Sequence, residues 1–156
     1  MKVKIMNKCG KSAIVNMDKS LQLYPHFKLQ ELANNLGDPK QPQMILSPEQ
    51  DELLWMIEQL RSWWSKPMTC SSCYRQPDFN KSVGGAANSL HLQALAFDWK
   101  VNVTQQERTN IVNYWKNLCD IRHHVGGINL YNWGFHLDAS EDKFGYTAFK
   151  IRDKMK

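Results

Sequence analysis

The feature that most constrains this chain of 156 residues is a set of three polar side chains in two short passages. His91 and Asp98 lie in one passage, and His136 lies in the other, between Gly134 and Asp138. Two imidazoles and one carboxylate form a ligand set for one zinc ion, with a fourth coordination position left free for water. Because a free position distinguishes a catalytic zinc site from a structural one, these residues predict a catalytic metal site.

The spacing of His91 and Asp98 limits how the chain can bring them together. Six residues separate them, so they do not form a helical i, i+4 pair, and on one regular strand they would face opposite sides. We therefore expect His91 at the end of a loop. Asp98 lies in an apolar run and needs a partner, because burying an unpaired charge is costly. A metal, an arginine or a capped backbone could each be that partner of Asp98. For such pairs, a salt-bridged Asp98 beside a hydrogen-bonded His91 is a commoner outcome than metal binding.

Five ordered blocks resemble a known family. Ser89-x-His91, followed by Ala96-x-Asp98, resembles the Ser-x-His-x-x-Gly-x-Ala-x-Asp signature of zinc peptidoglycan peptidases. These are the D-alanyl-D-alanine carboxypeptidases and dipeptidases, and the L-alanoyl-D-glutamate endopeptidases of phages. The other blocks resemble the family's Phe-x-Leu-x-Glu, Ser-Gly-Tyr-Arg-Ser-Pro-x-x-Asn, Gly-Gly and Gly-Gly-x-Gly-x-Tyr segments, at residues 26–32, 72–80, 83–85 and 126–131. The resemblance covers about residues 26–138 and implies zinc bound by His91, Asp98 and His136.

The chain departs from the family pattern at several positions. Three family glycines are replaced, by Cys73, Ala94 and Asn129. Well-studied relatives carry an acidic general base three residues before the last zinc histidine, where this chain has Trp133. Asp138 is the nearest acidic alternative, and on a strand it would share a face with His136. Asp138 is therefore a candidate general base, and equally a candidate for orienting a metal ligand. Glu141 and Asp142 are further candidates for the base.

The resemblance also implies roles in substrate binding. Arg75 matches a family arginine, whose fork holds a substrate carboxylate or the developing oxyanion. The alternative for Arg75 is a structural ion pair with Asp78 or Asp98. Ser89 matches a serine that contacts substrate in relatives, or it shapes the turn that follows. Tyr74 either packs beside Arg75 at the substrate or fills the core.

Two functions follow from the resemblance. The first is a zinc peptidase that hydrolyses peptidoglycan stem peptides, as a phage or prophage endolysin. The second is a non-catalytic zinc module that binds cell walls or proteins, like the Hedgehog signalling domain, which shares the family's fold. The tryptophan at the position of the acidic base favours the second.

Composition agrees with a cell-wall partner. The net charge of +5 suits an anionic partner, and the chain has no long Lys/Arg run and no nucleic-acid motif. No stretch is apolar enough to cross a membrane, and the first residues do not resemble a secretory signal. We therefore expect synthesis in the cytoplasm, action on the wall after release or export, and a monomer. Cys70-x-x-Cys73 has the spacing of a redox pair or of half a zinc knuckle, but no second Cys-x-x-Cys completes a four-cysteine site, so the four cysteines are expected to be free thiols.

The patterns predict one α+β domain over residues 1–156, with a small antiparallel sheet and flanking helices. Helices are expected from Leu29 to Leu36, from the N-cap Ser47, and from the capping box at Thr104. Strands are expected at residues 2–5, 67–71, 92–100, 127–131, 135–138 and 146–152.

Overall fold

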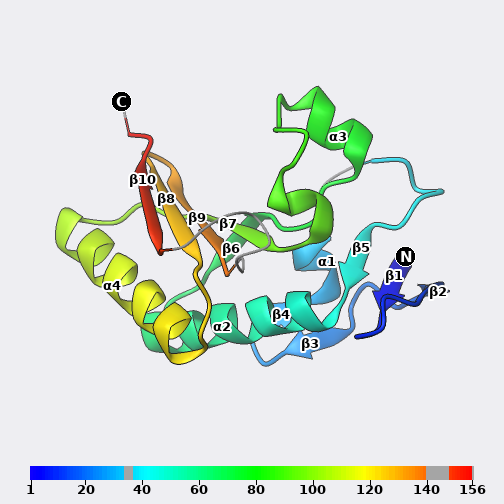
Figure 1. The fold of residues 1–156 in the computed structure, drawn as a ribbon, viewed down its shortest axis with the longest axis horizontal. Coiled ribbons are helices and arrows are strands. Elements are labelled where there is room, and N and C mark those ends of the chain that lie inside the picture. The colour runs from blue at the N-terminus through cyan, green and yellow to red at the C-terminus, as the bar shows by residue number, and fades with distance from the viewer. Residues whose placement is uncertain (34–36, 140–147, 156) are drawn as a thin grey trace.

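The computed structural model describes residues 1–33, 37–139 and 148–155, and confirms an α+β fold (Figure 1). In chain order its elements are β1 (Lys2–Met6), β2 (Ser12–Asn16), β3 (Gln22–Tyr24), β4 (Phe27–Lys28), α1 (Leu29–Leu32), β5 (Met44–Leu46), α2 (Pro48–Trp64), β6 (Thr69–Ser72), α3 (Pro77–Ser82), the 3-10 helix η1 (Leu90–Gln93), β7 (Ala96–Lys100), α4 (Gln105–Ile121), β8 (Gly127–Tyr131), β9 (Gly134–Asp138) and β10 (Lys150–Asp153).

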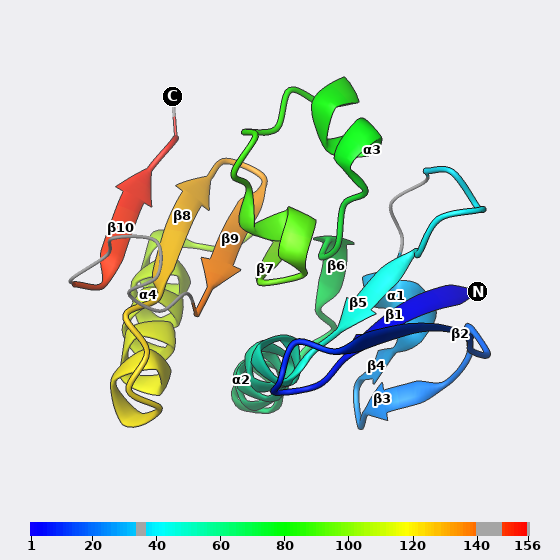
Figure 2. The same cartoon turned by 45° about the vertical axis from the view of Figure 1, so that its right-hand side comes forward.

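The central sheet has the strand order β10-β8-β9-β7-β6 (Figure 2). Its neighbouring strands are antiparallel, except that the edge strand β10 runs parallel to β8. The expected antiparallel sheet is therefore present, with one parallel edge strand that the sequence pattern did not predict. The strand expected from Tyr146 begins at Lys150 in the described residues, and Tyr146 lies outside them.

Both long helices begin at the capping residues that the sequence predicts. The Ser47 hydroxyl accepts a hydrogen bond from the backbone N–H of Gln50 at 3.1 Å, at the start of α2. Thr104 and Glu107 form a reciprocal capping box at the start of α4. Each cap satisfies backbone groups that the first helical turn leaves without intrahelical partners.

These two helices cover one face of the central sheet, and α3 and η1 lie on the other side (Figures 1 and 2). The Trp115 indole N–H donates to the carbonyls of Gly127 and Asp138, at 3.0 and 3.2 Å, and so ties α4 to β8 and β9. Trp64 of α2 packs edge-on against Trp99 of β7, with ring centroids 5.3 Å apart. The helix-covered face is therefore the hydrophobic core, and it leaves the opposite face of the sheet available for polar chemistry.

The N-terminal part forms two smaller sheets. The strand predicted at residues 2–5 is confirmed as β1, which pairs antiparallel with β2 and parallel with β5. The strands β3 and β4 form a short hairpin. The helix predicted from Leu29 to Leu36 is present as α1, which ends at Leu32 with its C-cap at Ala33, and Leu36 lies outside the described residues. Among the described residues, none of the helices is both long and apolar enough for a transmembrane span.

Candidate metal centre

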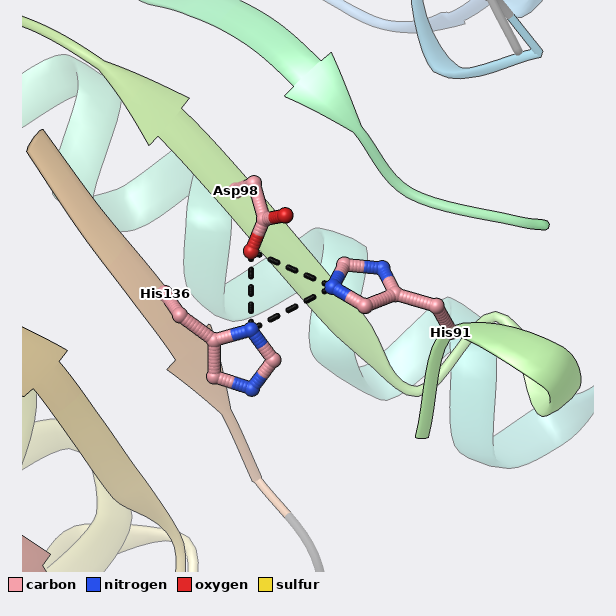
Figure 3. Close-up of side chains that lie close together, drawn as sticks. All are labelled: His91, Asp98 and His136. Atoms are coloured by element: carbon pink, nitrogen blue, oxygen red, sulfur yellow. Dashed lines mark hydrogen bonds and ion pairs between the residues drawn. The ribbon is translucent and has the colours of Figure 1, made fainter. Parts of the chain in front are cut away.

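The three predicted ligands converge on the open face of the central sheet (Figure 3). His91 comes from η1, Asp98 from β7 and His136 from β9. Asp98 and His136 are direct cross-strand partners in the antiparallel pairing of β7 and β9. Such partners have adjacent side chains on one face, so the strand register alone brings two of the three ligands together.

His91 reaches the site because the chain turns sharply before β7. The strand expected over residues 92–100 is wrong in its first part, where η1 occupies Leu90–Gln93 and β7 starts at Ala96. The turn ends at Ala94, which has a left-handed backbone with φ 57°. This conformation favours glycine, which is the residue that the resembling signature has there. His91 is expected at the end of a loop; it lies instead within the short 3-10 helix η1, outside any regular strand.

The three facing atoms lie at distances that suit one zinc ion. Nε2 of His91 lies 3.1 Å from Oδ1 of Asp98, and Nδ1 of His136 lies 2.8 Å from the same oxygen. The two nitrogens are 3.3 Å apart. Tetrahedral ligands at about 2.0–2.1 Å from zinc are separated by about 3.3–3.4 Å, so small movements would fit the ion. Imidazole nitrogen and carboxylate oxygen are also ligands that zinc prefers.

Hydrogen bonds influence which atoms of the three ligand side chains carry a proton. Nδ1 of His91 lies 2.7 Å from the Cys73 carbonyl, which only accepts, so Nδ1 carries a proton and Nε2 is the ring nitrogen that faces the metal position. Burial alone would raise the pKa of Asp98, but hydrogen bonds from His136 and His91 outweigh it and hold that pKa well below its usual range. Asp98 is therefore ionised at neutral pH, as a metal ligand must be.

Arg75 pairs with the second oxygen of Asp98. Its Nη2 donates to Oδ2 of Asp98 at 2.7 Å, and its Nε donates to the hydroxyl of Ser72 at 2.8 Å. Of the two structural partners considered for Arg75, the structure has Asp98 rather than Asp78. The carboxylate presents Oδ1 to the histidines (Figure 3), while Arg75 holds Oδ2, and together these contacts fix its orientation.

Asp138 lies on the far side of His136 from the converging atoms. Its Oδ2 is 3.7 Å from Nε2 of His136, whereas Nδ1 of the same ring faces Asp98 and His91. Asp138 is only 2% exposed, so this carboxylate is buried beside the ring. It shares a strand face with His136, as predicted. This position is one from which a carboxylate orients a ligand ring, and it is separated from the metal position by that ring.

Other sequence candidates are also placed. The Ser89 hydroxyl caps η1 and accepts from the His91 N–H at 3.4 Å, so Ser89 does shape the turn. Tyr74 is buried in the hydrophobic core. Burial raises the pKa of the Cys73 thiol to about 12, so Cys73 is a neutral thiol at neutral pH. Glu141 and Asp142 lie outside the described residues.

A pocket of about 420 Å³ shares Asp98 with the metal centre, and neither His91 nor His136 is among the residues that line it. Asp98 and Arg75 border it, together with Ser71, Ser72, Phe79, Val83, Lys100 and Trp133. The tryptophan that replaces the expected acidic base is therefore a wall of this pocket. Neither Ser72 nor Lys100 was a sequence candidate. Lys100 had a usable signal, because it lies two residues after Asp98 on the same strand and so on the same face.

Two imidazoles, an oriented carboxylate and an adjoining pocket define a mononuclear metal centre of the kind found in zinc hydrolases. A family model described as Peptidase M15 matches residues 25–138, and the chain belongs to this peptidase family. Peptidases of the family are zinc-dependent, so the chain is a metallopeptidase by family, with His91, Asp98 and His136 able to hold the ion. A comparison with curated proteins finds no significant match.

The metal centre makes a direct prediction about zinc content. His91→Asn and His136→Asn should each abolish stoichiometric zinc, because two protein ligands do not hold the ion as three do. His123→Asn is the matched control, since His123 is exposed and its positive φ of 59° is tolerated by asparagine. Elemental analysis of the purified variants measures the effect. Retention of zinc in both site variants would rule out this centre.

Proposed function

We propose that this chain is a zinc peptidase that hydrolyses peptide bonds of bacterial peptidoglycan stem peptides, acting as a phage or prophage endolysin. The observation that carries the proposal is the convergence of His91, Asp98 and His136 beside an open pocket, in a chain of the M15 family. The net charge of +5 agrees with an anionic wall as the target. We further propose that the protein acts as a monomer, on the wall, after release or export from the cell that makes it.

The chemistry divides between the ion and the side chains of this chain. Zinc in such a site activates water for attack and polarises the scissile carbonyl. His91, Asp98 and His136 hold the ion, and the Asp98 carboxylate is kept in place by Arg75. Because Arg75 also borders the pocket, we propose that its guanidinium meets a substrate carboxylate or the developing oxyanion, for which its fork is suited. Ser89 and Tyr74 remain candidate substrate contacts by resemblance, although Tyr74 is buried.

For Asp138 we favour the role of a positioning residue that acts through His136. Its carboxylate lies beside Nε2, so it would favour the tautomer with the proton on Nε2 when Nδ1 binds a metal in place of its hydrogen bond to Asp98. Nδ1 is the ring nitrogen that faces the metal position. A carboxylate beyond a metal histidine commonly has this role, and a general base would instead need to reach the attacking water.

One observation favours a second candidate function. Among the described residues that border the pocket, Asp98 is the one acidic side chain, and Trp133 stands where relatives have their base. A module that holds zinc and binds cell walls or proteins without cutting them would need no base. The two functions are separated by testing for hydrolysis.

The zinc-loaded protein should release soluble fragments from purified peptidoglycan, and His136→Asn should release none. His123→Asn should match the wild type. Mass spectrometry of the fragments identifies the bond: free D-alanine indicates a carboxypeptidase, and new D-glutamyl termini indicate an L-alanoyl-D-glutamate endopeptidase. Binding to the wall without any released fragment would contradict the peptidase and support the non-catalytic module.

Asp138→Asn should weaken zinc affinity by roughly 10–100-fold, and excess zinc should restore the maximal rate. The reason is that asparagine fills the same space but no longer fixes the His136 ring by its charge. Asp120→Asn is the control, because Asp120 pairs with Lys116 on the exposed side of α4. Zinc titrations followed by rate measurements test the point. A maximal rate that stays about 10²–10⁴-fold low at saturating zinc would assign Asp138 as the general base instead.

A further inference from the structure

The pocket beside the metal centre has a charge that the metal centre does not use. Asp98 and Lys100 lie two residues apart on β7, so both side chains emerge on the open face of the sheet. The positive charge of Arg75 is already paired with Asp98. Lys100 is exposed and borders the same pocket, and within the described ranges no side chain forms an ion pair with it. The pocket therefore offers the Lys100 ammonium to an incoming ligand, in addition to the guanidinium of Arg75.

Part of the pocket lining is apolar and partly exposed. Trp133 lies between β8 and β9, is 41% exposed, and stacks on Tyr131 with ring centroids 4.7 Å apart. Val83, which follows α3, is 53% exposed on the same pocket. Exposed apolar side chains that gather around a pocket indicate a ligand-binding surface. An aromatic ring held by stacking is also pre-ordered, so it loses little conformational freedom on binding.

The position of the pocket relates these walls to the reaction. Asp98 borders the pocket on the side of its Oδ2 partner Arg75, while its Oδ1 faces the two histidines. A peptide whose scissile bond lies at the metal position would therefore place a neighbouring residue in the pocket that Lys100 and Trp133 both line. The chemistry of that residue should match one cation and one apolar wall.

We propose that this pocket selects peptides in which a residue next to the scissile bond carries a carboxylate, with Lys100 pairing the carboxylate and Trp133 covering the apolar part of that residue. The inference rests on the proposed peptidase function and adds two specificity-determining residues to it. The carboxylate is either the main-chain terminus of the peptide or an acidic side chain, because both present the same charge.

NMR titration of the zinc-loaded full chain distinguishes the two sources. The probes are N-acetyl-D-alanine, which has a main-chain carboxylate, N-acetyl-D-glutamate α-amide, which has only a side-chain carboxylate, and N-acetyl-D-alanine amide, which has neither. At least one acidic probe should bind more tightly than the neutral amide. Lys100→Met should weaken that probe by about 5- to 10-fold and leave the neutral amide unchanged. Lys11→Met is the matched control, because Lys11 is exposed between β1 and β2 and outside the pocket.

Trp133→Ala should weaken all three probes by a similar factor, because the ring contacts the uncharged body of the residue. Trp63→Ala is its control, since Trp63 is also 41% exposed and stacks on Tyr114 with a similar geometry. Acidic probes that bind Lys100→Met as tightly as the wild type, or no preference for acidic probes, would overturn the inference. If the probe carboxylate bound zinc instead of pairing with Lys100, acidic probes would bind Lys100→Met as tightly as the wild type.

Because the measurement is of binding, its failure is distinct from failure of the proposed function. A protein that hydrolyses peptidoglycan but shows no Lys100-dependent preference overturns only the pocket assignment. A protein that prefers acidic probes through Lys100 but cuts no wall retains the pocket and overturns the peptidase.

Discussion

The arrangement of the site depends on how the two oxygens of the buried Asp98 carboxylate are paired. The side chain is within a sheet whose other face is a packed core, and a charge there is costly unless its oxygens are paired. One oxygen meets His91 and His136, and the other meets Arg75. This division explains how one residue serves both a metal position and a pocket. It also makes Arg75 part of the support of the metal centre, whatever it does to the substrate.

The backbone makes that arrangement possible at two places. Gly134 starts β9 with φ 148°, and a Cβ there would lie 1.9 Å from the Trp99 carbonyl, so only glycine allows β9 to approach β7 this closely. That approach sets the register which places His136 opposite Asp98. Ala94 holds a left-handed turn at a cost of about 1–2 kcal/mol, and the turn aims His91 at the same point. Local strain is thus accepted where it positions a ligand.

Much of this could be predicted from the sequence, for reasons that differ by element. The helices at Ser47 and Thr104 were predictable because caps and apolar stripes are local signals, and β8 was predicted with its observed bounds. The ligand set was recognisable from an ordered family pattern. The 3-10 turn before β7 was missed because three or four residues give no periodicity. The Cys73 backbone carbonyl that holds His91 could not be predicted, because a backbone contact leaves no side-chain pattern in the sequence. For Arg75 the sequence offered two structural partners, Asp78 and Asp98, and only the fold shows that Asp98 is the one in contact.

We expect one zinc ion to be held by two imidazoles and one carboxylate, with a position left for water. X-ray absorption spectroscopy of the zinc-loaded protein at the zinc edge measures this ligand shell. We expect four-coordinate nitrogen and oxygen at about 2.0–2.1 Å, with the outer-shell scattering of two imidazoles. A sulfur contribution at about 2.3 Å, or a shell without imidazole scattering, would contradict it, because the ion would then be bound by the cysteines or elsewhere on the chain.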